Sequence, residues 1–200
     1  SVRDNLPSIS QERYENFISK CKEKLSYSRE PFALHFTEKY GDSHGLPPYW
    51  VLVNMMDFGQ MFTLYRGASR EIRKEIANNL GITPAVLDSW LKALNTARNI
   101  CAHHGRLWNR TQGTKPFIPR KDVRWHKPYE VAPEKIFAVL TLLSYLLEYI
   151  APHTQWRKRL LGLLGTRSDS EIQRMGFSKD WALCPFWSPY IKNACIAQSS

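Results

Sequence analysis

The chain has 200 residues, of which 43% are hydrophobic and 12% aromatic, which is enough for a substantial core and excludes a disordered chain. Its net charge of +10 and isoelectric point near 9.6 favour a polyanionic partner, with nucleic acid first and an anionic membrane surface second. The four cysteines lack Cys-x-x-Cys spacing, so we expect a reduced, cytoplasmic protein. No apolar run reaches the roughly 18 residues that cross a bilayer, so we expect no membrane segment.

Apolar residues recur at helical spacing almost throughout the chain, and capping residues mark where the helices begin and end. In chain order the predicted helices cover residues 10–25, 30–40, 47–65, 69–79, 83 to at least 101, 133–151, 153–164 and 168–175. Residues 111–132 contain several prolines and no period, which predicts one long loop. No strand alternation is present, so the sequence predicts an all-α fold.

The length suits a single helical domain over residues 1–200, with its core at about 25–165. The chain begins Ser1-Val2-Arg3 without methionine, which leaves room for a missing N-terminal segment of a longer protein.

The most chemically concentrated segment is 98–110, directly after a helix that Thr83-Pro84 introduces. It contains three arginines, two histidines, two asparagines and one tryptophan. A fixed guanidinium can stabilise charge that builds on phosphoryl oxygens, and an imidazole can move protons near neutral pH. The segment therefore predicts binding or chemistry at a phosphodiester.

A regular helix turns about 100° per residue, and continuing it through the segment gives the two histidines different surroundings. His104 falls with Cys101 on the core-facing side, where a buried structural histidine is expected. His103 falls on the opposite, solvent-facing stripe together with Arg106 and Arg110. Asn99 lies one turn before His103, close enough to hydrogen-bond its ring.

Arg98 and His103 are about 140° apart on the same regular helix, too far for a close pair. Three arrangements would bring them to one site. The arginine side chain wraps round the helix, Gly105 ends the helix and reorients His103, or a second subunit completes the site. The last arrangement suits in-line transfer at phosphorus, which uses an acid and a base on opposite sides.

At these residues the chain resembles the Abi-like family of abortive-infection proteins (AbiD/AbiF type) within the HEPN superfamily. The similarity extends over most of residues 25–185 and rests on one block, Leu94-Asn95-x-x-Arg98-Asn99-x-Cys101-Ala102-His103-His104-x-Arg106-Leu107-Trp108-Asn109-Arg110. The resemblance implies an α-helical HEPN bundle, to which peripheral helices and the long proline-containing loop are added.

The resemblance also implies a metal-independent endoribonuclease of an abortive-infection or toxin–antitoxin-like system, without a cofactor. Its Arg-x(4-6)-His motif falls on Arg98 and His103, with Asn99 and His104 as secondary residues. The partners it implies are RNA, a second copy of the chain that completes the active site, and an antitoxin or noncoding RNA regulator. Beside the motif, we expect RNA binding by Arg106, Asn109 and Arg110.

Two other functions compete with this interpretation. Cys101, His103 and His104 supply zinc-type ligands, although Cys101 and His103 lie about 160° apart on a helix. A non-catalytic module would use the arginines to bind RNA or an acidic partner. A nucleophilic enzyme is disfavoured, because Cys101 is expected to face the core and no serine lies in a Gly-x-Ser-x-Gly segment. The basic run 157–159 is interpreted as a solvated helix face.

Overall fold

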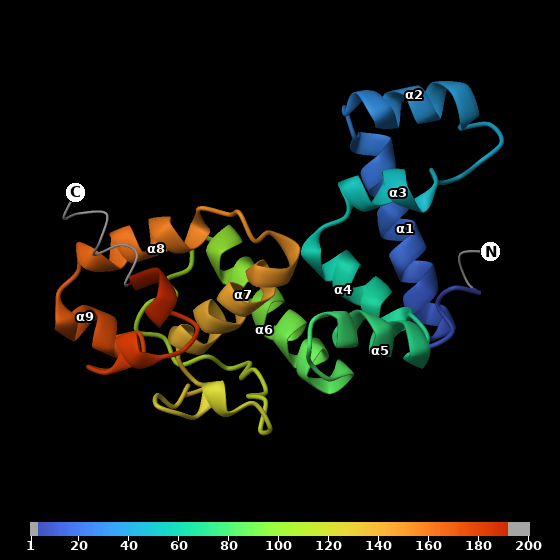
Figure 1. Ribbon diagram of the computed structural model, residues 1–200. Helices are drawn as coiled ribbons and strands as arrows, with labels where there is room; N and C mark the ends of the chain where they lie inside the picture. Colours follow the sequence, from blue (N-terminus) through green and yellow to red (C-terminus); the bar gives the residue numbers. More distant parts are fainter. Residues whose placement is uncertain (1–3, 192–200) are drawn as a thin grey trace. The chain divides into compact units, whose positions relative to one another are not determined.

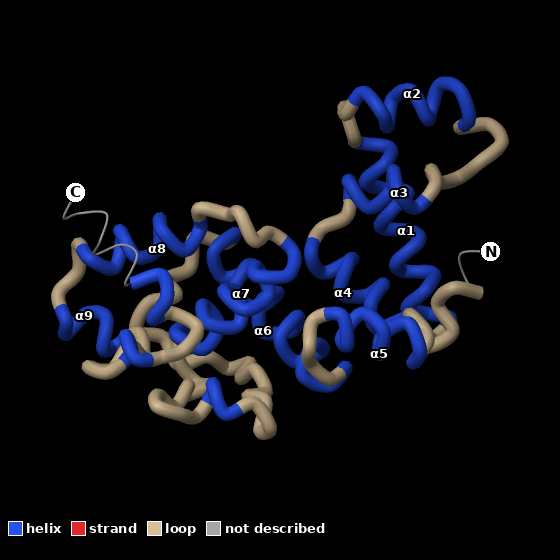
Figure 2. The backbone as a smooth tube through the Cα atoms, viewed as in Figure 1, coloured by secondary structure: helices blue, strands red, loops and turns tan. Residues whose placement is uncertain are grey.

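The computed structural model describes residues 4–191, and all regular structure within this range is helical (Figure 1). The α-helices are α1 (Gln11–Tyr27), α2 (Pro31–Tyr40), α3 (Tyr49–Leu52), α4 (Phe58–Gly67), α5 (Arg70–Asn79), α6 (Pro84–Ala102), α7 (Ile136–Ile150), α8 (Trp156–Gly165) and α9 (Asp169–Arg174). Three short 3-10 helices are η1 (Val53–Met55), η2 (Val123–Trp125) and η3 (Trp181–Leu183). Figure 2 shows only helices and loops in the described range, which confirms the predicted all-α class.

Internal contacts divide the chain into two compact units, Ser1–Glu75 and Ile76–Ser200. A single domain over residues 1–200 stays a prediction. The two units differ sharply in charge: the first has 11 Lys and Arg against 10 Asp and Glu, and the second has the remaining 17 against 8. Nearly all of the net positive charge is therefore in the second unit, which also contains the 98–110 segment.

In the first unit, α1 packs its apolar stripe against α3. Phe17 and Cys21 of α1 form a buried cluster with Leu52 of α3. The start of α1 is capped as predicted, because the Ser10 hydroxyl accepts a hydrogen bond from the Arg13 N–H at 3.4 Å.

The prediction of one helix over residues 47–65 is wrong, because Asp57 begins a new helix, α4, inside that range. The Asp57 carboxylate accepts from the Gln60 N–H at 2.8 Å, and the Gln60 side-chain oxygen accepts from the Asp57 N–H at 3.1 Å. This reciprocal capping box holds Asp57 in an extended conformation, with ψ of 170°, so the preceding helix cannot continue through it.

In the second unit, α6 and α7 enclose an aromatic core. Trp90, Trp125 and Trp187 are completely buried. The ring centres of Trp90 and Trp125 lie 5.2 Å apart, and the Phe186 ring lies 4.5 Å from that of Trp125 at an interplanar angle of 47°. The Trp187 indole N–H donates to the Thr141 hydroxyl at 2.9 Å, so its polar atom is satisfied inside the core.

The predicted loop over residues 111–132 is largely irregular apart from η2, and hydrogen bonds attach it to the core at several points. The Trp90 indole N–H donates to the Phe117 carbonyl at 2.8 Å, and the Phe117 N–H donates to the Ser89 hydroxyl at 2.9 Å. The Gln112 N–H donates to the Glu134 carbonyl at 2.8 Å. These bonds fix the chain that follows the 98–110 segment.

The prediction of a solvated face over residues 157–159 holds for Lys158 and Arg159 but is wrong for Arg157, which is only 3% exposed. Its guanidinium donates from Nε to the Ser144 hydroxyl at 2.8 Å and also to the Ser144 carbonyl, and it lies over the Tyr190 ring at 4.5 Å. Arg157 therefore links α8 to α7.

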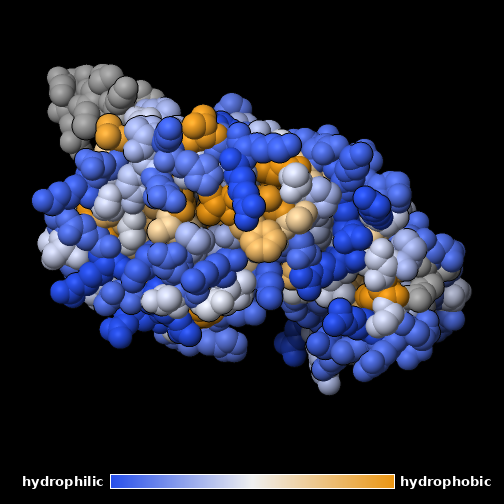
Figure 3. All heavy atoms as spheres, turned by 90° about the horizontal axis from the view of Figure 1, so that it is seen from below, coloured by the Kyte–Doolittle hydropathy of each residue, from blue (hydrophilic) through white to orange (hydrophobic). Residues whose placement is uncertain are grey.

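The surface in Figure 3 is predominantly hydrophilic and carries separate hydrophobic patches. Large exposed apolar side chains include Trp50 in the first unit, which is 75% exposed, and Ile150 in the second, which is 69% exposed. No helix within residues 4–191 is both long enough and apolar enough to span a membrane.

Candidate functional site

Helix α6 carries the motif to the surface. It begins as predicted, with the Thr83 hydroxyl accepting from the Val86 N–H at 3.4 Å and Pro84 in the first turn. Its buried stripe runs through Trp90 and ends at Ala97. The last turn projects beyond that core, so Arg98 and Asn99 are exposed there.

The helix ends at Ala102, and His103 is its C-cap. The His104 N–H donates to the Cys101 carbonyl at 3.0 Å, and the Gly105 N–H donates to the Ile100 carbonyl at 2.7 Å. This pair of bonds is a Schellman motif, in which the residue after the C-cap adopts the left-handed conformation. His104 occupies that position with φ of 55°, where glycine is the usual residue.

Gly105 is required at the next position for a different reason. A Cβ atom there would lie 2.8 Å from the Ile100 Cγ2 atom and 2.9 Å from the Ile100 carbonyl oxygen. Gly105 therefore allows the close approach to Ile100 that the Schellman motif needs, whereas His104 adopts the left-handed conformation.

Two predictions based on a continuous helix are consequently wrong. His104 was expected in the apolar face, yet it is exposed, because the chain leaves the helix before reaching it. Cys101 was also expected to face the core, yet it is exposed, because the buried stripe has already ended at Ala97.

The polar residues of the motif pair differently from the expected pattern. The Arg98 Nη1 atom donates to the Asn99 side-chain oxygen at 3.1 Å, so the Asn99 amide contacts the arginine. The Asn99 backbone carbonyl accepts a hydrogen bond from the His103 N–H at 3.0 Å. Within residues 4–191 no hydrogen bond links the Asn99 amide to the exposed His103 ring. The guanidinium is therefore oriented and the imidazole is left open to a ligand.

Residues 107–110 form a tight turn beyond the helix end. Leu107 packs against the buried cluster that contains Ala97, and the Arg110 N–H donates to the Leu107 carbonyl at 3.3 Å. Asn109, at the third position of the turn, has φ of 55°, as a type II turn requires. The expectation that Arg106 and Arg110 share a helical stripe with His103 is wrong, because both follow the end of α6.

The three residues expected to bind RNA nevertheless come together. Arg106, Asn109 and Arg110 line one surface pocket of about 360 Å³. Trp108 also lines this pocket, and sequence reasoning gave it no binding role. The signal was present, because an aromatic residue between arginines is a common pattern for stacking on nucleic-acid bases.

The zinc-type arrangement of Cys101, His103 and His104 is not formed. In the part of the chain that the structure describes, no three His, Cys, Asp or Glu side chains gather as a metal site would require.

Comparison with known proteins gives one match. The family model described as Abi-like protein matches residues 3–109, which is more than half of the chain and includes the motif from Arg98 to Asn109. No curated protein and no solved structure matches the chain.

Proposed function

The chain belongs to the Abi-like protein family, and from this membership we propose that it is a metal-independent endoribonuclease of the HEPN type, acting in abortive infection or a toxin–antitoxin-like system. The observation that carries the proposal is the exposure of Arg98, His103 and His104 together around the C-terminal end of α6. A ribonuclease needs these groups open to a phosphodiester, and none of the three is enclosed in the core.

In the proposed reaction, His103 removes the proton from a ribose 2′-hydroxyl. The 2′-oxygen then attacks the adjacent phosphorus, and the bond from phosphorus to the 5′-oxygen breaks, leaving a 2′,3′-cyclic phosphate and a 5′-hydroxyl. Arg98 stabilises the negative charge on the phosphoryl oxygens. Asn99 is a positioning residue, because its amide oxygen accepts a hydrogen bond from the arginine.

The leaving 5′-oxygen needs a proton from the side of phosphorus opposite the base. We propose that the second imidazole comes from another copy of the chain, so that the active site is completed in a homodimer. His104, which is also exposed, is the secondary candidate for the general acid that gives the leaving oxygen its proton. A noncoding RNA or antitoxin would restrain such an enzyme by covering this end of α6.

The distribution of charge supports an RNA substrate. The unit that contains the motif carries 17 Lys and Arg against 8 Asp and Glu, and the pocket beside the motif is lined by Arg106 and Arg110. Arginines that hold phosphates displace counterions, so binding should weaken with salt, with a logarithmic slope of about −0.7 for each phosphate held on a single strand.

The test is cleavage of RNA in excess chelator by the wild type and by Arg98→Ala, His103→Ala and His153→Ala. General acid–base catalysis contributes about 10² to 10⁴ in rate, so His103→Ala should lose at least about 100-fold. His153 is an exposed histidine outside the motif, and its variant should cut at the wild-type rate.

A single 2′-deoxy nucleotide at the cut site should block cleavage, because the nucleophile is then absent. Loss of wild-type cleavage on chelation, or undiminished cleavage by His103→Ala, would contradict the mechanism. A wild type that binds RNA without cutting it would instead establish the non-catalytic module.

A further inference from the structure

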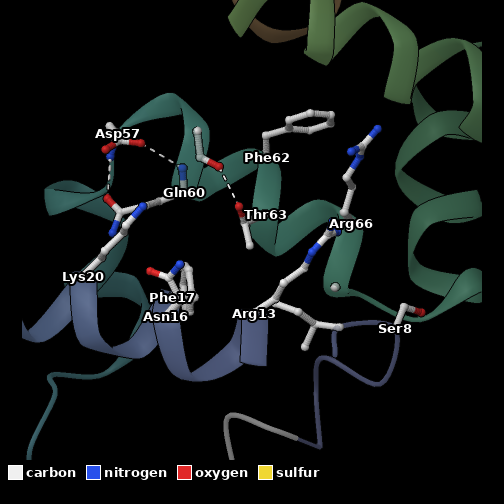
Figure 4. Close-up of a pocket in the computed structure, with 13 residues that line it drawn as sticks. Ser8, Arg13, Asn16, Phe17, Lys20, Asp57, Gln60, Phe62, Thr63 and Arg66 are labelled. Carbon is white, nitrogen blue, oxygen red and sulfur yellow. Dashed lines mark hydrogen bonds between the residues drawn. The ribbon is translucent and has the colours of Figure 1, made fainter. Parts of the chain in front are cut away.

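A polar groove lies between α1 and α4 in the first unit, and the proposed ribonuclease reaction does not use it (Figure 4). Its volume is about 470 Å³. Helix α1 contributes Arg13, Asn16 and Lys20 to one wall, and Thr63 of α4 lies on the other. The buried ring of Phe17 lies beneath them, so the groove combines an apolar base with polar walls.

The charges of α1 are separated by helix face. With about 100° per residue, Arg13, Lys20 and Lys24 fall within an arc of about 40° on the groove side. The acidic residues of the same helix fall on a different arc, about 80° to 160° away from Arg13: Glu12, Glu15 and Glu23. The acids of α1 therefore do not lie beside its groove-facing cations.

Only one of these three cations is neutralised. The Lys24 ammonium lies 2.7 Å from the Asp57 carboxylate. Arg13 and Lys20 have no acidic partner within the described residues, and Figure 4 shows that they extend across opposite ends of the groove. Arg13 extends toward Arg66 on α4, and Lys20 extends toward Gln60 and Asp57.

Arg66 of α4 also lines the groove, but its guanidinium stacks 4.4 Å from the centre of the Phe62 ring, and in Figure 4 both side chains extend away from α1. The first unit as a whole is nearly balanced in charge, so Arg13 and Lys20 form a local excess of positive charge on the groove side of α1. Such a local excess attracts a specific anion and not a long polyanion, which would be drawn to the positively charged second unit.

The spacing of the cations defines the shape of the anion. Arg13 and Lys20 are seven residues apart, so their Cα atoms are about 10 Å apart along the axis of α1. One compact phosphate does not extend over that distance, whereas a chain of phosphates does. The volume also lies within the range of about 300 to 1,000 Å³ that is typical of sites for organic ligands.

We propose that the groove between α1 and α4 binds a nucleoside polyphosphate, with its phosphate chain along Arg13 and Lys20. Asn16 and Thr63 line the stretch between the two cations. The Thr63 hydroxyl donates to the Gly59 carbonyl at 2.9 Å, so its oxygen would accept a hydrogen bond from a sugar hydroxyl, and the Asn16 amide would donate or accept one. The apolar base of the groove at Phe17 accommodates the nucleobase.

Calorimetric titration of the full chain with ATP, inorganic triphosphate and inorganic phosphate, at fixed ionic strength, tests this site. ATP should bind more tightly than inorganic triphosphate, and inorganic phosphate should bind most weakly. Each charged hydrogen bond that is lost should weaken ATP binding about tenfold or more, so Arg13→Gln combined with Lys20→Gln should lose at least about 100-fold.

The matched control is Lys22→Gln. Lys22 is exposed on the same helix, about 180° from Arg13, and its variant should bind ATP as the wild type does. Helix content measured by circular dichroism would show that each variant is folded. Absence of ATP binding, equal binding of ATP and inorganic triphosphate, or an equal loss in the Lys22→Gln variant would overturn the proposal.

Two further measurements separate this site from the proposed ribonuclease. His103→Ala should bind ATP with wild-type affinity, because the motif lies in the other unit. A single-stranded RNA that competes for the groove and binds it more tightly than ATP would overturn the assignment to a small ligand.

Discussion

Replacing His104 by glycine should stabilise the protein while removing an imidazole from the candidate active site. His104 has φ of 55°, and the left-handed conformation costs a residue with a side chain about 1–2 kcal/mol. Glycine removes this cost but makes the unfolded chain more flexible, which takes back about 0.4–1 kcal/mol. The net gain expected for His104→Gly is therefore about 0.5–1 kcal/mol.

The matched comparison is His104→Ala, which also lacks the imidazole but keeps a Cβ atom in the left-handed conformation. For a chain of this length, about 1 kcal/mol corresponds to about 2–4 °C in melting temperature. Thermal denaturation followed by circular dichroism should place His104→Gly above His104→Ala by about this amount. Equal melting temperatures would refute the claim that the helix end holds His104 in a strained conformation.

The same two variants also connect strain to function. A residue kept in an unfavourable conformation is often held there for its chemistry. If His104 donates the proton to the leaving oxygen, both variants should lose RNA cleavage to a similar extent, although their stabilities differ. Cleavage at the wild-type rate by His104→Gly would limit the role of His104 to ending the helix.

Three further outcomes follow from individual side chains. Burial raises the pKa of the Asp57 carboxylate, but the hydrogen bonds that it accepts together outweigh this effect and hold the pKa below its usual value. Asp57→Ala should therefore lower the free energy of unfolding by about 1 kcal/mol at pH 7. This difference should shrink below about pH 4, where the wild-type carboxylate is protonated, and denaturant titration at several pH values measures it. Arg157→Ala should cost about 2–4 kcal/mol in the same assay, and the exposed neighbour Lys158→Ala less than about 0.5 kcal/mol. Iodoacetamide at pH 8, mapped by mass spectrometry, should modify exposed Cys101 in the native protein and spare Cys21, whose pKa burial raises to about 11.

The sequence predicted helices well where their ends carry strong local signals. The Thr83-Pro84 start of α6 and the Ser10 cap of α1 are both found where expected, because capping depends on residues adjacent in sequence. The break at Asp57 had a readable signal as well, the Asp-x-x-Gln spacing of a capping box, but the apolar period on both sides concealed it.

The end of α6 was harder to predict for a physical reason. Sequence rules look for glycine at the left-handed position, whereas here a histidine occupies it and Gly105 follows one residue later. A helix continued past Ala102 then assigns the wrong surroundings to His104 and Arg106. The burial of Arg157 was equally invisible, because its partner Ser144 comes from another helix.

The placement of the tryptophans gives the two units different optical properties. Trp50 is the only tryptophan in residues 1–75 and is 75% exposed, whereas Trp90, Trp125 and Trp187 in the other unit have no exposed surface. Water shifts indole emission to longer wavelength, so the blue part of the native spectrum arises from the 76–200 unit. Tryptophan fluorescence that is excited selectively therefore reports the loss of that aromatic core during denaturation. Unfolding around the groove between α1 and α4 changes this signal little.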